Sequence, residues 1–153
     1  MIIRQISVFV ENRVGGMAEV AEILGEGGIN IKVASIADTA EFGILRMIVD
    51  DCDKAVKILT EHGIAVKFTD VCAVLMPHRP NGLSQILKAL SGKGINLEYV
   101  YAFVDRRKDS AIVVFKPDDL SGADDALTSS HISGLDVQSV IDMLENHSAV
   151  GYL

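Results

Sequence analysis

The sequence predicts an α+β protein built from two copies of one βαββαβ unit. Three observations carry this prediction: an internal repeat at an offset of 66 residues, alternating strand-like and helical stretches in each copy, and ample apolar material for a core. Of the 153 residues, 49% are apolar and 23% are charged, which excludes a disordered chain. The length fits one ordinary domain or two small ones.

The repeat is clearest just after the first predicted strand of each copy. Residues 12–17 align with residues 78–83, and residues 28–31 align with residues 94–97. Two copies that match in register at these positions predict a duplicated fold. The identities are Arg13 with Arg79, Gly16 with Gly82, and Gly28-Ile29-Asn30 with Gly94-Ile95-Asn96.

Copy one begins with a stretch rich in Ile, Val and Phe over residues 2–11, which predicts a strand. Residues 12–16 carry the side chains of a turn. From Met17 onward apolar residues recur at helical spacing, and Gly27-Gly28 ends this helix. The first half of the copy is therefore predicted as strand, loop and helix.

The rest of copy one predicts two strands, over residues 29–37 and 43–49, joined by a hairpin turn. Asp50-Asp51 then caps a second helix, which stops at Gly63. Residues 64–71 predict a fourth strand, which completes the order βαββαβ.

No Gly/Ser/Pro linker separates the copies. We therefore expect the last strand of the first domain, residues 1–71, to continue directly into the first strand of the second domain, residues 72–153. Such a continuous strand predicts that the two copies behave as a single unit.

Copy two repeats the pattern with a loop over residues 77–82, a helix over 83–93, and strands over 95–103 and 111–116. Its C-terminal segment diverges from copy one. The interpretation we favour aligns Gly63 with Gly134 across a three-residue insertion and places the last strand near 135–141.

The alternative for this C-terminal segment starts from a possible cap at Asp136. Apolar residues at helical spacing follow it, so a helix over residues 136–146 and a last strand over residues 149–153 also fit.

Composition and charge narrow the functional classes. Lys and Arg number 14 against 21 Asp and Glu, and the net charge of −7 argues against nucleic acid or an anionic membrane as a partner. The chain shows no membrane-spanning apolar run and no signal-peptide pattern at Met1, so we expect a cytoplasmic protein. Cys52 and Cys72 cannot build a disulfide framework and are expected to behave as small buried residues.

No catalytic or metal-binding constellation stands out in the sequence. The four histidines are dispersed, and His62 and His131 are interpreted as surface residues near helix C-termini. Asp50, Asp51 and Asp53 are interpreted as helix-capping acids. We therefore expect no enzyme activity, no cofactor and no metal ion.

A βαββαβ unit is a ferredoxin-like fold, and this fold occurs in proteins of many functions. The function must therefore be inferred from the residues of the site. RNA-recognition domains of this topology need aromatic residues on their central strands, and residues 43–49 hold none. Residues 6–20 followed by Gly28-Ile29-Asn30-Ile31 resemble the ACT domain, a small-molecule-sensing module of amino-acid metabolism. Residues 78–83 with Gly94-Ile95-Asn96-Leu97 resemble it again, whereas the chain beyond about residue 117 resembles it poorly. Copy one departs from the family pattern by having Val14 in place of the usual proline.

The resemblance implies two ACT units side by side, forming one eight-stranded antiparallel sheet with helices on one face. It also implies amino-acid binding between the first loop of one unit and the second strand of another. A glycine at the helix start lets a ligand approach free backbone N–H groups, and a side chain there is expected to block the ligand. The implied ligand-binding residues are Asn12, Gly15, Gly16, Met17, Asn30, Ile31, His78, Pro80, Asn81, Gly82, Leu83, Asn96 and Leu97.

The expected function is a non-catalytic regulatory protein that binds a free amino acid and forms a homodimer. The first alternative is a regulatory subunit that docks on a metabolic enzyme, similar to an acetolactate synthase small subunit. The second alternative is a structural dimer that binds no ligand.

Overall fold

The computed structural model describes residues 1–38, 41–105 and 109–145. The chain divides into two compact units. The first-copy unit comprises Arg4–Thr69, and the second-copy unit comprises Met1–Ile3 together with the chain from Asp70 onward. The elements are β1 (Ile2–Glu11), α1 (Gly16–Glu26), β2 (Ile31–Asp38), β3 (Phe42–Val49), α2 (Cys52–Glu61), β4 (Val66–Pro77), α3 (Gly82–Ser91), β5 (Leu97–Asp105), β6 (Ser110–Pro117), α4 (Leu120–Ser129) and α5 (Val137–Glu145).

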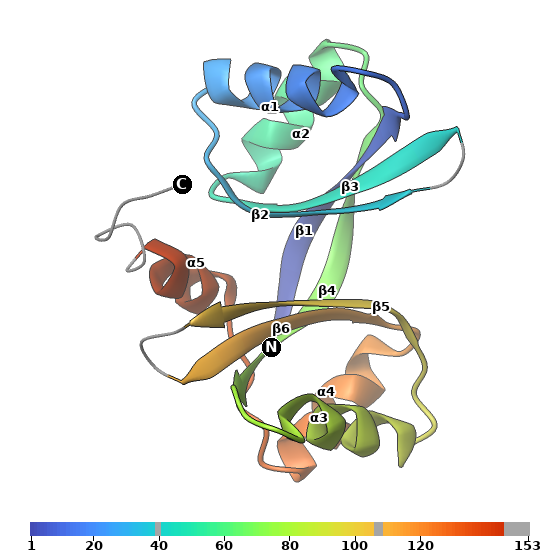
Figure 1. Ribbon diagram of the computed structural model, residues 1–153, viewed down its shortest axis with the longest axis vertical. Helices are drawn as coiled ribbons and strands as arrows, with labels where there is room; N and C mark the ends of the chain where they lie inside the picture. Colours follow the sequence, from blue (N-terminus) through green and yellow to red (C-terminus); the bar gives the residue numbers. More distant parts are fainter. Residues whose placement is uncertain (39–40, 106–108, 146–153) are drawn as a thin grey trace. The chain divides into compact units, whose positions relative to one another are not determined.

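In the first-copy unit the strands lie in the order β2-β3-β1-β4, and β3 pairs antiparallel with both β1 and β2. Alternate residues of β1, Val8 and Val10 among them, point into a core that also holds Leu24 of α1 and Leu59 of α2. Both helices therefore pack on one face of these strands (Figure 1). Asp51 begins α2 as its cap, because its carboxylate accepts a hydrogen bond from the N–H of Lys54 at 3.0 Å.

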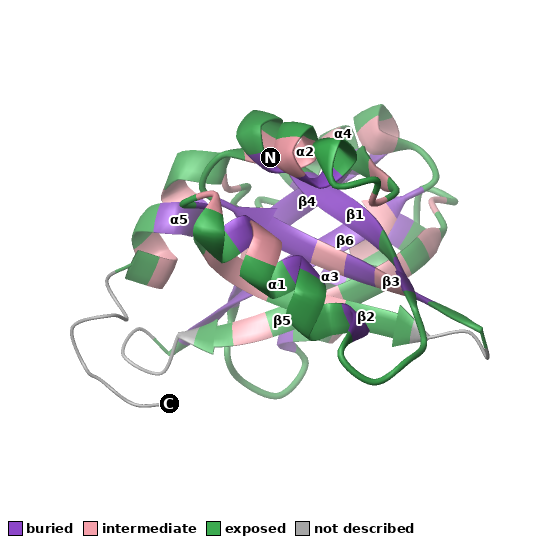
Figure 2. Ribbon diagram, turned by 90° about the horizontal axis from the view of Figure 1, so that it is seen from above, coloured by how far each residue is buried: buried purple, intermediate pink, exposed green. Residues whose placement is uncertain are grey.

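In the second-copy unit β6 pairs antiparallel with β4 and with β5. Val74 of β4 and Phe115 of β6 are fully buried in a core shared with Leu90 of α3 and Leu127 of α4. Buried residues run along β1, β4 and β6 in purple, whereas the outer faces of the helices are exposed (Figure 2). Cys72 also lies in this core, and burial raises the pKa of its thiol to about 11.

The sheet has six strands among the described residues, in the order β2-β3-β1-β4-β6-β5, and not the eight that we expected. The number of strands is lower by one because β4 is continuous and serves as the last strand of copy one and the first strand of copy two. This continuity confirms the prediction made from the missing linker. The other difference lies in the C-terminal segment.

The favoured last strand near residues 135–141 is wrong, because Val137–Glu145 forms helix α5. Gly134 makes a single antiparallel bridge with Val74, so pairing with β4 ends there. Asp136 then turns the chain into the helix by accepting a hydrogen bond from the N–H of Ser139 at 2.7 Å, which lowers the pKa of its carboxyl. The helix of the alternative interpretation is thus confirmed, and its strand over residues 149–153 lies outside the described residues.

The expected insertion before Gly134 is absent. The N–H of Ile64 donates to the carbonyl of Leu59 at 2.9 Å, and the N–H of Ile132 donates to the carbonyl of Leu127 at 3.0 Å. These matching bonds pair Gly63 with His131, and both residues adopt positive φ, 73° and 56°. The copies therefore stay in register through this turn.

None of the described helices is both long enough and apolar enough to cross a lipid bilayer.

We expect the whole chain to unfold in one cooperative transition. The units share the continuous strand β4, and Met1 belongs to the second-copy unit, where its carbonyl accepts from the N–H of Ala73 at 2.9 Å. Scanning calorimetry of the full chain measures this directly. Two resolved transitions, together with a 1–71 fragment that is as stable as the whole chain, would contradict the expectation.

Candidate functional site

The loop between β1 and α1 is shaped by two adjacent glycines with different roles. Gly15 is the residue before the helix and has φ 84°, which glycine adopts without strain. Gly16 is buried, and a Cβ there would lie 2.8 Å from the carbonyl oxygen of Glu11. Gly15 thus supplies the turn, and Gly16 lets the helix start against the end of the strand.

The second copy repeats this geometry with a different residue at the turn. Asn81 takes the left-handed conformation at φ 70°, which asparagine tolerates better than most residues. A Cβ on Gly82 would lie only 2.4 Å from the carbonyl oxygen of Pro77. A side chain at Gly82 would therefore displace the strand end itself, so it is no clean test of ligand binding.

The first N–H of each helix is already bonded within its loop. Gly16 donates to the carbonyl of Arg13 at 3.2 Å, and Gly82 donates to the carbonyl of Arg79 at 3.0 Å. In this structure both N–H groups therefore already have an acceptor, and ligand binding at these groups stays a prediction. The groups without an intrahelical acceptor are those of the next two residues in each helix.

A cavity of about 370 Å³ borders the loop of the first copy. It lies between the end of β1, the first turns of α1, the start of β3 and the turn that leads from α2 into β4. Its lining residues are Phe9, Val10, Glu11, Arg13, Gly16, Glu19, Val20, Phe42, His62, Gly63, Ile64 and Ala65.

A cavity of about 450 Å³ occupies the corresponding place in the second copy. Its lining residues are Leu75, Met76, Pro77, Gly82, Gln85, Ile86, Asp109, Ser110, Ser130, His131, Ile132 and Ser133. Both volumes fall in the range of small-molecule sites, roughly 300–1,000 Å³.

The two cavities are equivalent parts of the repeat. At the back of the first, the N–H of Phe9 donates to the carbonyl of Ala65 at 2.9 Å. At the back of the second, the N–H of Leu75 donates to the carbonyl of Ser133 at 2.9 Å. Each unit therefore holds a cavity of its own, built from the same backbone framework.

Charge distinguishes the two cavities. In the first, the guanidinium of Arg13 pairs with Glu11, at 3.2 Å between Nε and Oε2, and with Glu19. The hydrogen bond that this guanidinium donates to the carboxylate of Glu19 raises its pKa. In the second, Pro77 and Gln85 stand at the positions of Glu11 and Glu19, so the acids that pair with Arg13 have no counterparts.

Of the predicted site residues, Gly16 and Gly82 line the cavities. The other loop residues named in the sequence lie beside them without lining either cavity: Asn12, Gly15, Met17, His78, Pro80, Asn81 and Leu83.

The asparagines on the second strands lie away from their own loops. Asn30 follows α1, and its N–H donates to the carboxylate of Asp50 at 3.0 Å. Because α1 has 11 residues, a helix about 16 Å long stands between Gly16 and the segment that holds Asn30 and Ile31. The equivalent Asn96, which precedes Leu97, donates to Asp118 at 3.1 Å. Within a unit the structure therefore does not bring the two halves of the predicted site together.

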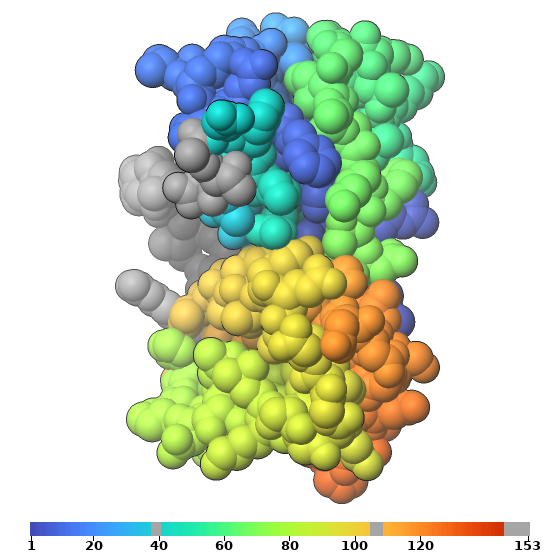
Figure 3. Space-filling model, turned by 90° about the vertical axis from the view of Figure 1, so that its right-hand side faces the viewer, coloured from blue at the N-terminus to red at the C-terminus, as the bar shows by residue number. Residues whose placement is uncertain are grey.

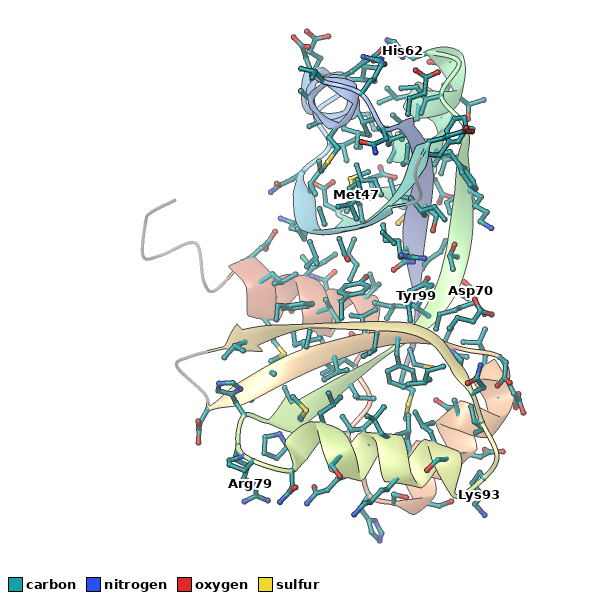
Figure 4. All side chains as sticks on the ribbon, turned by 45° about the vertical axis from the view of Figure 1, so that its right-hand side comes forward. Met47, His62, Asp70, Arg79, Lys93 and Tyr99 are labelled. Atoms are coloured by element: carbon teal, nitrogen blue, oxygen red, sulfur yellow. The ribbon has the colours of Figure 1, made fainter. Side chains whose placement is uncertain are left out.

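The sequence analysis missed the turn between the second helix of each copy and its following strand. His62 ends α2, where its ring Nδ1 lies 2.8 Å from the carbonyl oxygen of Ile58, and it is labelled in Figure 4. The position near a helix C-terminus is as predicted, but His62 and His131 also line the two cavities. The sequence gives no sign that the two histidines occupy similar places. They are 69 residues apart, whereas the copies are offset by 68 residues in this segment, so His62 aligns with Ser130.

In the described part of the chain, no three His, Cys, Asp or Glu side chains gather in a way that could hold a metal ion.

Comparison with known proteins identifies a family that matches the sequence and solved structures that share the fold. The sequence profile of a family described as an ACT domain pair matches residues 1–144. A crystal structure of a protein from Bacteroides thetaiotaomicron is similar at 36% identity, with a TM-score of 0.86, covering 92% of this chain and 96% of that one. No curated protein matches the sequence.

Two further solved structures share the fold at lower identity. The ligand-free regulatory subunit of aspartate kinase from Thermus thermophilus is similar with a TM-score of 0.62 and 20% identity, covering 84% of this chain and 90% of that one. The corresponding subunit from Thermus flavus is similar with a TM-score of 0.59 and 19% identity, covering 84% and 92%.

We expect His131→Gly to stabilise the protein in the absence of ligand. His131 has φ 56°, a conformation that costs a residue with a Cβ roughly 1 kcal/mol and glycine nothing. The greater freedom of glycine in the unfolded chain offsets part of this gain. Urea denaturation should therefore show a free energy of unfolding higher by about 0.5 kcal/mol. A loss of stability would instead show that the imidazole holds the turn together.

Proposed function

Because this chain belongs to the ACT domain pair family, we propose that it is a non-catalytic regulatory protein that binds a free amino acid. The observation that carries the proposal is the equivalent cavity beside the first loop of each copy. Two copies keep the same cavity framework although their side chains differ, which favours a role in binding over an accident of packing.

The ends of the cavities suit the polar part of an amino acid. Each lies at the start of a helix of ten or more residues, where the positive end of the helix dipole and unpaired N–H groups attract a carboxylate. Gly16 and Gly82 carry no Cβ, so a ligand can come close to this backbone. The apolar walls, formed in the second copy by Met76, Ile86 and Ile132, suit the rest of a small molecule.

A regulatory protein needs a target, and a metabolic enzyme is the partner that we propose. The likeness in fold to the regulatory subunits of aspartate kinase motivates this choice, as does the earlier resemblance to acetolactate synthase small subunits. Co-purification of a large enzyme with the tagged chain distinguishes a docked subunit from a free-standing sensor.

We also propose that the protein forms a homodimer through its sheet edges. In the described chain β2 and β5 stand at the two ends of the strand order, and an outer strand can pair with a strand of another chain. The residues of β5 reach the surface in Figure 3, and Val100 and Val104 on this strand are 42% and 40% exposed. Sedimentation equilibrium measures the mass of the assembly.

The proposed function predicts a saturable calorimetric response to at least one of the twenty amino acids. At about 100 times its dissociation constant, that amino acid should add roughly 2.7 kcal/mol to the free energy of unfolding, because it binds only the folded state. For a chain of 153 residues this corresponds to a rise of about 5–10 °C in melting temperature.

The control for this experiment is the D-enantiomer of the amino acid that responds. Equal shifts with both enantiomers would indicate a general solute effect. If none of the twenty amino acids gives heat or a thermal shift, the protein is a structural dimer without ligand and the proposed function fails.

A further inference from the structure

The first copy carries its own carboxylate at the mouth of its cavity. Glu19 lies one turn into α1, and its carboxylate is held by the guanidinium of Arg13, which also pairs with Glu11. Arg13 and Glu19 both line the cavity. The cation that borders this cavity is therefore already neutralised by side chains of the same unit.

The second copy has the same cation without the carboxylate. Arg79 stands at the position of Arg13, and Gln85 lines the cavity at the position of Glu19. Pro77 and Gln85 take the positions of the two acids that pair with Arg13, so these acids have no counterparts for Arg79. Its side chain extends from the loop before α3 into solvent (Figure 4).

We infer that the second-copy cavity binds the carboxylate of an amino acid in the place that Glu19 fills in the first copy. This inference rests on the proposed function and adds to it that each chain binds one ligand, held by Arg79. On binding, the guanidinium folds from solvent toward Gln85, as Arg13 folds toward Glu19. A guanidinium and a carboxylate form a charge-assisted pair, which is stronger than a neutral hydrogen bond.

The lining of this cavity suits the rest of a zwitterion. Among the described residues of this lining Asp109 is the one carboxylate, and it stands immediately before β6, where it can attract an α-ammonium group. Ser130, His131 and Ser133 add polar groups along one wall. The lining thus offers an anion for the ammonium group, and the proposed cation for the carboxylate is Arg79, which stands in the adjoining loop outside the lining. The first cavity differs because it is lined by two acids and their paired arginine.

Two substitutions at exposed positions test the inference by titration calorimetry with the amino acid that binds the wild type. Arg79→Gln removes the cation, and Gln85→Glu supplies the missing carboxylate from the protein itself at the Arg13–Glu19 spacing. Each should raise the dissociation constant about tenfold or more, the effect of losing a charged hydrogen bond. The matched control is Glu19→Gln in the first copy, which should change the dissociation constant less than about twofold.

Two further probes identify the ligand group. The carboxamide of the same amino acid lacks the negative charge and should bind wild type about tenfold more weakly, with no further loss in Arg79→Gln. Inorganic phosphate at the same concentrations should give no saturable heat. Phosphate binding that depends on Arg79, with the amino acid unaffected by this residue, would assign the site to phosphate and overturn the inference.

The stoichiometry separates the inference from the proposed function. One ligand per chain, weakened by both second-copy variants, supports it. Two ligands per chain, or binding that Arg79→Gln leaves unchanged, overturns the inference while the proposed function stands. If no amino acid binds, both fail together. Melting temperatures without ligand confirm that each variant is folded.

Discussion

The close approach of a helix start to a strand end is the constraint on which the rest of each unit depends. In both copies the backbone leaves no space for a Cβ at the first helical residue, where Gly16 and Gly82 stand. A left-handed residue immediately before it, Gly15 or Asn81, turns the chain. Because the helix is anchored at this point, its first turn forms one wall of the cavity and its far end sets where the second strand begins.

The duplication makes the two units an internal comparison of the same framework. Backbone hydrogen bonds repeat in both copies, from Phe9 to Ala65 and from Leu75 to Ser133. The side chains around that framework have diverged, most clearly where Glu19 is replaced by Gln85. The two units thus share one backbone geometry and differ in the charge around their cavities.

The second copy also differs in how its sheet is completed. Where copy one uses a full strand after its second helix, copy two makes a single bridge at Gly134 and turns into α5. Met1 pairs with β4 instead, because its carbonyl accepts a hydrogen bond from the N–H of Ala73. Its side chain packs against Gly134, where an added Cβ would lie 2.3 Å from the Cβ of Met1. The start of the chain thus belongs to the second unit.

The duplication, the strands and helices of copy one and the continuity through β4 could all be predicted from the sequence, because periodicity and turn residues are local signals. The sequence also located the glycine loops. The conformation of residues 135–141 could not be predicted in this way, because Gly134 can pair with a strand and Asp136 can cap a helix. The folded chain uses both, with a bridge at Gly134 followed by helix α5. The cavities could not be predicted from the sequence either. The turns at His62 and His131 come close to the first loops only in the folded chain, and no spacing in the sequence indicates this.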